Sequence, residues 1–199
     1  MSFDITNMYS NVLTDDLLHI IDLICKQQVT DEKEKHELIS LSKVILEQNN
    51  FQSENDFYSR ESGLAMGSPT SSVFSEIYLQ YMECTAICDI LVHNNITGYF
   101  RYIDGILVCD KTITDVIEVF GSFNKLMPTM KFTTEKETEN KLNFLDITIA
   151  KEQDKLTFDI YRKPTTTDSI IPGDSCYPIE HKMAAVRYLT NRMNKTNAM

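Results

Sequence analysis

An Asp-Gly dipeptide between two apolar runs constrains the fold of this chain more than any other feature. Asp104-Gly105 interrupts residues 97–109, a segment rich in β-branched and aromatic side chains on both sides of the dipeptide. Asp-Gly suits a type I′ turn, because both central residues of that turn need positive φ. The sequence therefore predicts a β-hairpin with its turn at Asp104-Gly105, so at least part of the chain has to form an antiparallel sheet.

The remaining elements are predicted from the spacing of apolar residues and from the turn residues between them. Thr14 has the character of a helix N-cap, because two acidic residues and an apolar helical pattern follow it. The mixture of hairpins and helices predicts an α+β fold, with helices packed on a sheet. We expect helices at 15–28, 34–48, 69–93, 113–126 and 180–193, a hairpin at 51–60, strands at 130–136, 142–150 and 155–162, and a loop at 163–178.

The charge of the chain limits the partners that it can bind. Its 199 residues carry 29 acidic and 19 basic side chains, a net charge of −10. That balance disfavours a protein that binds duplexes mainly through a basic surface. Positive charge lies towards the C-terminus, since residues 131–199 hold 11 basic and 10 acidic side chains. No apolar run approaches the ~18 residues that cross a bilayer, and the start has no secretory signal, so we expect neither a membrane partner nor secretion.

The five cysteines are predicted to be unpaired. They lie at positions 25, 84, 88, 109 and 176, and no two of them have the C-x-x-C spacing of a zinc or redox site. Cys84 and Cys88 would lie one helical turn apart in an apolar stretch, so we predict that they are small core residues. A reducing, intracellular compartment and no disulfide partner are therefore expected.

Two acidic residues have the placement of metal ligands. Asp4 lies in the apolar start of the chain, and Asp104 lies at the tip of the predicted hairpin. A sheet that sets these strands side by side would bring the two carboxylates together, and Mg²⁺ is held in proteins by such carboxylates and by substrate phosphates. Two such ions activate an attacking hydroxyl and stabilise a leaving pyrophosphate. Taken alone, Asp104 is also explained as an ordinary turn residue and Asp4 as a surface acid near a chain end.

A run of small residues precedes the predicted long helix. The segment G-L-A-M-G-S-P-T-S-S at 63–72 contains Gly63, Gly67 and Ser68, which allow close approach to the backbone. A base pair and a sugar would need such an approach. An ordinary loop with a helix cap explains the same residues.

Three segments in this order resemble the reverse transcriptases of Penelope-like retroelements: F-D-I-T-N-M-Y-S-N-V from residue 3, the segment at 63–72, and Y-F-R-Y-I-D-G-I-L-V from residue 99. Two later segments, K-L-N-F-L-D-I-T-I at 141–149 and Y-R-K-P-T-T-T-D at 161–168, are similar to the family's Phe-Leu-Asp strand and to its segment after the palm. The resemblance implies a polymerase palm over residues 1–162, with a ferredoxin-like antiparallel sheet and helices on one face. Residues 163–199 would begin a post-palm, thumb-connecting segment.

The resemblance also implies an activity and a set of site residues. The activity is two-metal, template-directed DNA synthesis from deoxynucleoside triphosphates on an RNA or DNA template with a primer. Asp4 and Asp104 would be the catalytic residues and would hold Mg²⁺ or Mn²⁺. Nucleotide and template would be bound by Tyr9, Gly67, Ser68 and Tyr102, and the primer side by Tyr161, Arg162 and Lys163. Judged from the residues alone, Tyr9 is also explained as a packing tyrosine, and residues 161–163 as a solvated basic edge.

The chain departs from the family's pattern at Gly105, where a second aspartate is usual. Glycine supplies no carboxylate, so we expect weaker metal binding. The chain also begins almost at Asp4 and ends soon after the post-palm segment, so we expect a fragment without fingers, full thumb or nuclease, with weak or no activity in isolation. The alternatives are a non-enzymatic remnant or reused interaction module derived from the palm, and an unrelated α+β binding domain. By analogy with the family, the protein would be nuclear or cytoplasmic.

Overall fold

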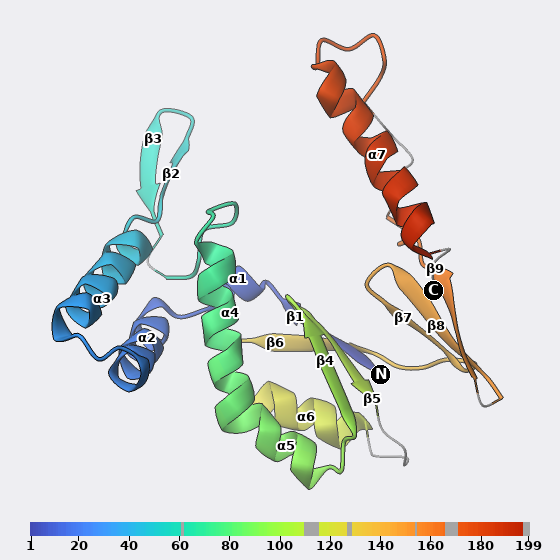
Figure 1. The fold of residues 1–199 in the computed structure, drawn as a ribbon, viewed down its shortest axis with the longest axis horizontal. Coiled ribbons are helices and arrows are strands. Elements are labelled where there is room, and N and C mark those ends of the chain that lie inside the picture. Colours follow the sequence, from blue (N-terminus) through green and yellow to red (C-terminus); the bar gives the residue numbers. More distant parts are fainter. Residues whose placement is uncertain (61, 110–115, 127–128, 154, 166–170, 197–199) are drawn as a thin grey trace. The chain divides into compact units, whose positions relative to one another are not determined.

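The chain folds into two compact units, Met1–Glu135 and Lys136–Met199 (Figure 1). The computed structural model describes residues 1–199 except 61, 110–115, 127–128, 154, 166–170 and 197–199. Both units contain antiparallel sheets and helices, so the predicted α+β class is confirmed. The boundary predicted between residues 162 and 163 is one between the palm and the post-palm segment, not one between compact units. It stays a prediction.

The first unit is built on a four-stranded sheet in the order β4-β5-β1-β6. The strand β1 (Ser2–Thr6) lies inside this sheet and pairs antiparallel with β5 (Gly105–Cys109) on one side and β6 (Lys131–Glu135) on the other. The edge strand β4 (Gly98–Tyr102) is joined to β5 by the predicted hairpin. The start of the chain therefore lies directly beside the hairpin that the sequence singles out.

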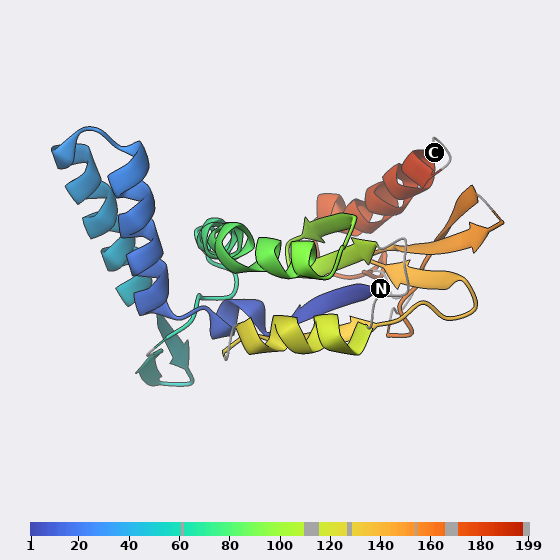
Figure 2. The ribbon, with the colours of Figure 1, turned by 90° about the horizontal axis from the view of Figure 1, so that it is seen from below.

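One face of this sheet carries the core. Phe3 and Ile5 on β1 and Ile106 and Val108 on β5 are each at most 2% exposed, and they share this face because side chains alternate along a strand. The helix α6 (Val116–Leu126) runs beside β1 in both ribbon views (Figure 1, Figure 2), and the Phe123 ring lies 5.1 Å from that of Phe3. The same apolar cluster includes residues of α4 (Ser71–Met82) and of the π-helical turn η1 (Glu83–Ile87), which continues into α5 (Cys88–His93).

Two helices and a small hairpin complete the first unit. After the single turn α1 (Met8–Asn11) come α2 (Thr14–Gln28) and α3 (Glu32–Glu47), and the Asp31 side chain caps α3 by accepting a hydrogen bond from the Lys33 amide. The hairpin of β2 (Asn50–Ser53) and β3 (Asp56–Ser59) is exposed, with the Phe51 and Tyr58 rings stacked 5.4 Å apart. These two helices and this hairpin confirm the prediction to within two residues. The predicted helix at 69–93 is also present, although the π-helical turn interrupts it.

The second unit contains a three-stranded antiparallel sheet and one long helix. Its strands are β7 (Lys141–Phe144), β8 (Ile147–Glu152) and β9 (Lys155–Ile160), and its helix is α7 (Ile179–Thr196). The predicted single strand at 142–150 is wrong, because Leu145 adopts a φ of 54° and the chain turns back at Leu145-Asp146. The predicted helices at 180–193 and 113–126 are confirmed, although residues 113–115 lie outside the described residues.

The turn of the hairpin in the first unit lies one residue earlier than the sequence predicted. Tyr102 pairs with Gly105, so Ile103 and Asp104 are the two turn residues and Gly105 is the first residue of β5. Ile103 has a φ of 55°, whereas Asp104 is not among the residues with positive φ. The predicted type I′ turn at Asp104-Gly105 is therefore wrong. The strand register that places Ile106 and Val108 in the core overrides the preference of Asp-Gly for the central positions of such a turn.

The cysteines are all free, and the expected absence of a disulfide among them is confirmed. Cys25 is buried, but Cys84 and Cys88 are exposed, so their predicted place in the core is wrong. The buried residue of this stretch is Ile87, because the π-helical turn holds an extra residue and shifts the apolar face. No helix within the described part of the chain is long and apolar enough to cross a membrane.

Candidate functional site

The exposed face of the four-stranded sheet carries a row of cross-strand partners that contains Asp4, one of the two predicted catalytic residues. Tyr102 pairs with Gly105, Gly105 pairs with Asp4, and Asp4 pairs with Thr133. Residues directly opposite each other in antiparallel strands point to the same face, here the one opposite Phe3 and Ile106. Asp4 is exposed on this face, and Tyr102 is 61% exposed. The fold therefore brings together two motifs that are far apart in the sequence.

Asp104 is fixed next to this row by its backbone. Its carbonyl oxygen accepts a hydrogen bond from the Ile5 amide, with 3.0 Å between nitrogen and oxygen. The turn residue Asp104 therefore lies beside β1, the strand that bears Asp4, and neighbouring strands of an antiparallel sheet are about 4.8 Å apart. Ile103, the other turn residue, adopts a φ of 55°, which costs a β-branched side chain about 1–2 kcal/mol. Such strain is maintained only where the surrounding structure holds the turn in place.

The two carboxylates have the chemistry of a partial Mg²⁺ site. Asp4 is exposed and Asp104 is half-buried, so their oxygens are hard, accessible donors of the kind that Mg²⁺ prefers. No group of three or more His, Cys, Asp or Glu side chains suited to a metal is found within the described residues. Two carboxylates fit an ion that completes its shell with water and substrate phosphates, and do not fit an ion held entirely by protein.

The segment at 63–72 is anchored next to the end of β1. The Leu64 amide donates a hydrogen bond of 2.7 Å to the Tyr9 carbonyl oxygen, and the Asn49 side chain donates one of 2.8 Å to the Gly63 carbonyl. Gly63 has a φ of 92°, and a Cβ atom there would lie 2.7 Å from the Ser10 carbonyl oxygen. Only glycine allows this approach. Tyr9 itself is half-buried against the core.

In the same segment Gly67 is exposed and Ser68 is half-buried. Gly67 has a φ of 89° and nothing within 4 Å of the position that a Cβ would occupy, so its surroundings are open. The Ser68 hydroxyl lies 2.9 Å from that of Thr70, and a hollow of about 80 Å³ lies beside it. The structure therefore ties the segment with Gly67 and Ser68 to α1. Asp4 lies on β1, the strand before α1, and Asp104 lies in the turn beside β1.

The predicted primer-side residues Tyr161, Arg162 and Lys163 belong to the second unit. The Tyr161 amide donates a hydrogen bond of 2.9 Å to the Asp146 carbonyl oxygen, which fixes the end of β9 to the turn between β7 and β8. Lys163 is exposed, and Arg162 is exposed beside it. Their role on the primer side remains a prediction.

The fold was compared with known proteins. No protein-family model matches the chain, and no curated protein matches it. Among solved structures, the chain is similar to apo telomerase from Candida tropicalis truncated from its C-terminal domain, with a TM-score of 0.59 and 17% sequence identity. The fold is distantly reverse-transcriptase-like. The likeness covers 79% of this chain but only 35% of the telomerase chain, so this chain spans about a third of that polymerase.

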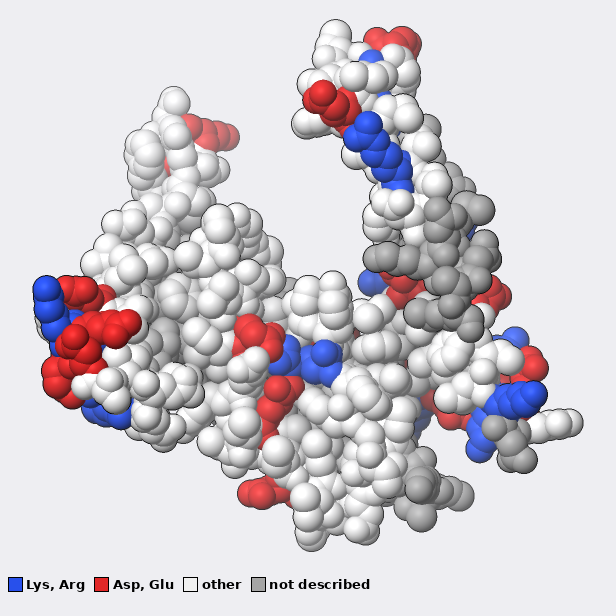
Figure 3. Space-filling model, viewed as in Figure 1, with Lys and Arg blue, Asp and Glu red and all other residues white. Residues whose placement is uncertain are grey.

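On the face of the first unit shown in Figure 3, the described charged side chains are of both signs. Over α3, acidic and basic side chains lie next to one another, as expected from the pairs Lys33–Glu37, Lys35–Glu32 and Lys43–Glu47. Elsewhere on the first unit, the described Lys and Arg side chains on this face form no continuous patch (Figure 3). Exposed pairs of this kind contribute little to stability.

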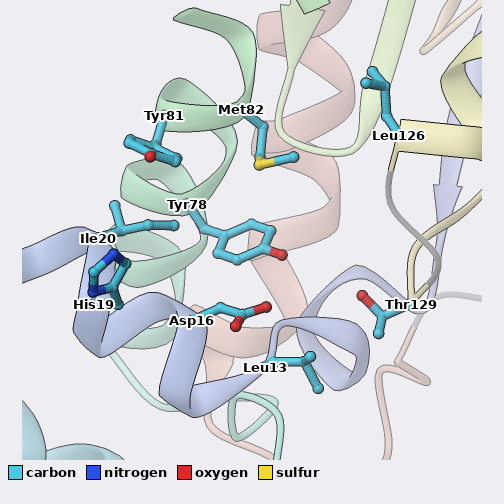
Figure 4. A pocket seen from close by; sticks show the side chains of 9 residues that line it. All are labelled: Leu13, Asp16, His19, Ile20, Tyr78, Tyr81, Met82, Leu126 and Thr129. Atoms are coloured by element: carbon cyan, nitrogen blue, oxygen red, sulfur yellow. The ribbon is translucent and has the colours of Figure 1, made fainter. Parts of the chain in front are cut away.

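A separate cavity of about 390 Å³ lies between α2 and α4 (Figure 4). In Figure 4 the Tyr78 hydroxyl, the Asp16 carboxylate and the Thr129 hydroxyl point into the same space. Burial, and then the negative charge of Asp16, raise the pKa of Tyr78 above its usual value. None of the predicted site residues lines this cavity, which is formed by Leu13, Asp16, His19, Ile20, Tyr78, Tyr81, Met82, Leu126 and Thr129.

A charged cluster that was not predicted from the sequence lies beneath the hairpin. Arg101 on β4 lies on the core face and forms ion pairs with Glu76 of α4 and with Glu83, the first residue of η1. Hydrogen bonds from Arg101 hold the pKa of Glu76 below its usual range, and those that Glu76 accepts raise the pKa of Arg101. Burial, and the hydrogen bond that Tyr99 donates to Glu83, raise the pKa of the Tyr99 hydroxyl. The available signal was an arginine at an inward-facing strand position, between Phe100 and Tyr102.

Proposed function

We propose that this chain is the palm region of a reverse transcriptase related to those of Penelope-like retroelements. The observation that carries the proposal is the row in which Asp4 lies opposite Gly105, immediately beside the turn that holds Asp104. The sheet order β4-β5-β1-β6, with helical segments between β1 and β4 and between β5 and β6, supports the predicted ferredoxin-like palm. The likeness to telomerase supports a polymerase of this class.

In this proposal Asp4 and Asp104 hold two Mg²⁺ or Mn²⁺ ions at the exposed face of the sheet. The ions would activate the primer's 3′ hydroxyl and neutralise charge on the triphosphate. The protein's own contribution is orientation: β1 presents Asp4, and the Ile5 amide fixes the backbone of Asp104. Two-metal polymerases of this kind copy a template by adding deoxynucleotides to a primer.

The other predicted residues have proposed roles around this centre. Tyr9 would pack under the sugar and select deoxynucleotides, since its backbone is tied to the segment of Gly67 and Ser68 that would face the templating base. Tyr102 is in the same row as Asp4 and would contact the nucleotide. The primer backbone would be approached by Tyr161, Arg162 and Lys163. The template would be RNA or DNA.

Gly105 favours a second candidate function. It stands opposite Asp4 where a second carboxylate would complete the metal site, and glycine provides none. The isolated chain would then be a non-enzymatic remnant or an interaction module that retains the palm fold.

Primer extension with the full chain distinguishes the two. An RNA template with a DNA primer, deoxynucleoside triphosphates and Mg²⁺ or Mn²⁺ is expected to give incorporation that falls by at least ~100-fold in Asp4→Ala and Asp104→Ala, because each metal contributes several kcal/mol to the transition state. Asp146→Ala is the matched control, since Asp146 occupies the equivalent turn position in the second unit. The polymerase proposal fails if neither the folded wild-type chain nor Gly105→Asp incorporates nucleotides, and that result favours the remnant.

A further inference from the structure

The Arg101 side chain has all its hydrogen-bond donors satisfied beneath the hairpin turn. It is only 9% exposed, and its five hydrogen bonds match the five N–H donors of a guanidinium. Two bonds of 2.8 Å go to the two oxygens of Glu76, and bonds of 2.5 and 3.2 Å go to the two oxygens of Glu83. Lysine, with one nitrogen, cannot reproduce this geometry.

The fifth bond reaches the turn itself. Arg101 Nη1 donates to the Ile103 carbonyl oxygen at 3.2 Å. Ile103 is the residue with a φ of 55°, and its carbonyl belongs to the peptide unit that leads into Asp104. The buried guanidinium of Arg101 therefore contacts the peptide unit that joins Ile103 to Asp104. The orientation of this peptide unit helps to set where the Asp104 side chain leaves the backbone.

The helix that supplies the acceptors departs from regular geometry at the same place. Glu83 begins the π-helical turn η1, and such turns are rare and often occur at functional sites. Tyr99, two residues before Arg101, donates its hydroxyl hydrogen to the Glu83 oxygen that Arg101 Nε also contacts. Glu83 is thus held from two positions on β4, and it holds Arg101 in turn.

We propose that Arg101 is a positioning residue that holds the strained Ile103-Asp104 turn against β1 and thereby sets the place of the Asp104 carboxylate. The cluster of Glu76, Glu83 and Tyr99 orients the guanidinium, which passes this constraint to the turn through the Ile103 carbonyl. That this positioning serves metal binding at Asp104 rests on the proposed function. That Arg101 holds the turn does not depend on the proposed function.

A merely structural arginine would hold α4 to the sheet and stabilise the whole unit evenly. A positioning arginine would in addition hold the turn locally. The hydrogen bond from the Ile5 amide to the Asp104 carbonyl reports on the turn, and the bond of 3.0 Å from the Val108 amide to the Met1 carbonyl reports on the same sheet away from it. Native-state amide exchange measures the opening of each bond separately.

The experiment is hydrogen exchange, followed by NMR, in the full chain and its Arg101→Lys variant. We expect exchange of the Ile5 amide to become about tenfold faster, while that of the Val108 amide changes by less than about twofold. Glu83→Gln keeps the shape of the acceptor and is expected to give the same pattern more weakly, so it serves if Arg101→Lys does not fold. Lys26→Met, which removes the exposed pair with Asp22, is the matched control and should change neither amide.

Equal acceleration of both amides, or no change at Ile5, would overturn the positioning role and leave a structural one. A parallel titration with Mn²⁺ separates this from the proposed function. If the wild-type chain binds Mn²⁺ and Asp104→Asn does not, Arg101→Lys should bind it about tenfold more weakly. If the wild-type chain fails to bind Mn²⁺, the metal site is refuted, while the exchange of the Ile5 amide still decides whether Arg101 holds the turn.

Discussion

The two units contain the same hairpin turn in different surroundings. In the first unit, Tyr102-Ile103-Asp104-Gly105 turns with a φ of 55° at Ile103, and in the second, Phe144-Leu145-Asp146-Ile147 turns with a φ of 54° at Leu145. Even the hydrogen bond to the third strand is shared: the Asp104 carbonyl accepts from Ile5, and the Asp146 carbonyl accepts from Tyr161. An aromatic residue, an aliphatic residue and an aspartate therefore form the same local structure twice.

The strand next to each turn differs. In the first unit the residue opposite Gly105 is Asp4, whereas in the second the residue opposite Ile147 is Ile160. The first turn also receives a hydrogen bond from the Arg101 side chain to the Ile103 carbonyl. The same turn forms in both hairpins, but a pair of carboxylates arises only where a third strand contributes the second one. The second hairpin is therefore an internal control for the first.

The largest expected difference between the hairpins concerns metal affinity. Gly105→Asp adds a carboxylate in the same row as Asp4, and we expect it to tighten Mg²⁺ binding about tenfold, because a unit charge near a cation at an exposed site contributes about 1–2 kcal/mol. Ile147→Asp creates the same two adjacent acids in the second hairpin, where Ile160 lies opposite, and should not create a site. Isothermal titration with Mg²⁺ measures both.

A second control for this prediction uses Asp4. The double variant Asp4→Asn with Gly105→Asp should lose the gain, because the added carboxylate then lacks its cross-strand partner. Equal affinity of Gly105→Asp and the wild-type chain would show that the row in the first unit is no more a metal site than the row in the second.

A smaller difference is expected in the strain of the two turns. Ile103→Asn should raise the free energy of unfolding by about 1 kcal/mol, since asparagine tolerates positive φ and a β-branched residue does not. Leu145→Asn should raise it by only a few tenths of a kcal/mol, because leucine is not β-branched. Both side chains are similarly exposed, at 46% and 41%, so lost burial affects them alike. Urea unfolding of each variant provides the measurement, and destabilisation by Ile103→Asn alone would indicate that the Ile103 side chain makes a contact that the Leu145 side chain lacks.

The smallest expected effect concerns pH and the arginine cluster beneath the first hairpin. Hydrogen bonds from Arg101 lower the pKa of Glu76 below its ordinary value of 4.5, so this ionised carboxylate stabilises the fold above that value, and the stabilisation is lost as the pH falls through the lowered pKa. Glu76→Gln should therefore flatten the fall in stability below about pH 4.5, by roughly 0.5 kcal/mol or less, because the side chain is 46% exposed and solvent screens it.

Urea unfolding of the wild-type chain and Glu76→Gln at several pH values between 3 and 7 tests this. Parallel curves over that range would mean that ionised Glu76 contributes nothing to the stability of the first unit.

The sequence predicted those features that depend on local patterns. Apolar spacing was enough for α2, α3 and α7, and the segment of Asp104 was correctly predicted as a hairpin. The position of the turn was predicted wrongly. Tyr102 pairs with Gly105 because the residues of β5 that enter the core decide the register, and the Asp-Gly preference does not. In the second unit, a pattern that predicted one strand contains a positive φ at Leu145, for which leucine gives no signal.

The candidate site was only partly predictable. Asp4 and Asp104 were selected because of their motifs, but the position of the Asp104 turn beside β1 follows from the strand order β4-β5-β1-β6, which no local pattern determines. Arg101 was missed because its acceptors Glu76 and Glu83 lie 25 and 18 residues away, and a contact of that range has no periodic signature.

The close packing of Gly63 on Ser10 joins the segment at 63–72 to α1, although the two are far apart in the sequence. The backbone at Gly63 packs directly on that of α1, with no side chain between them, and the Leu64 amide bonds to the Tyr9 carbonyl, so the segment bearing Gly67 and Ser68 is attached to α1. Only Asn7 separates α1 from β1, so the helix to which this segment is attached follows directly after the strand that bears Asp4. A methyl group at position 63 would clash with the Ser10 carbonyl oxygen and disrupt this packing.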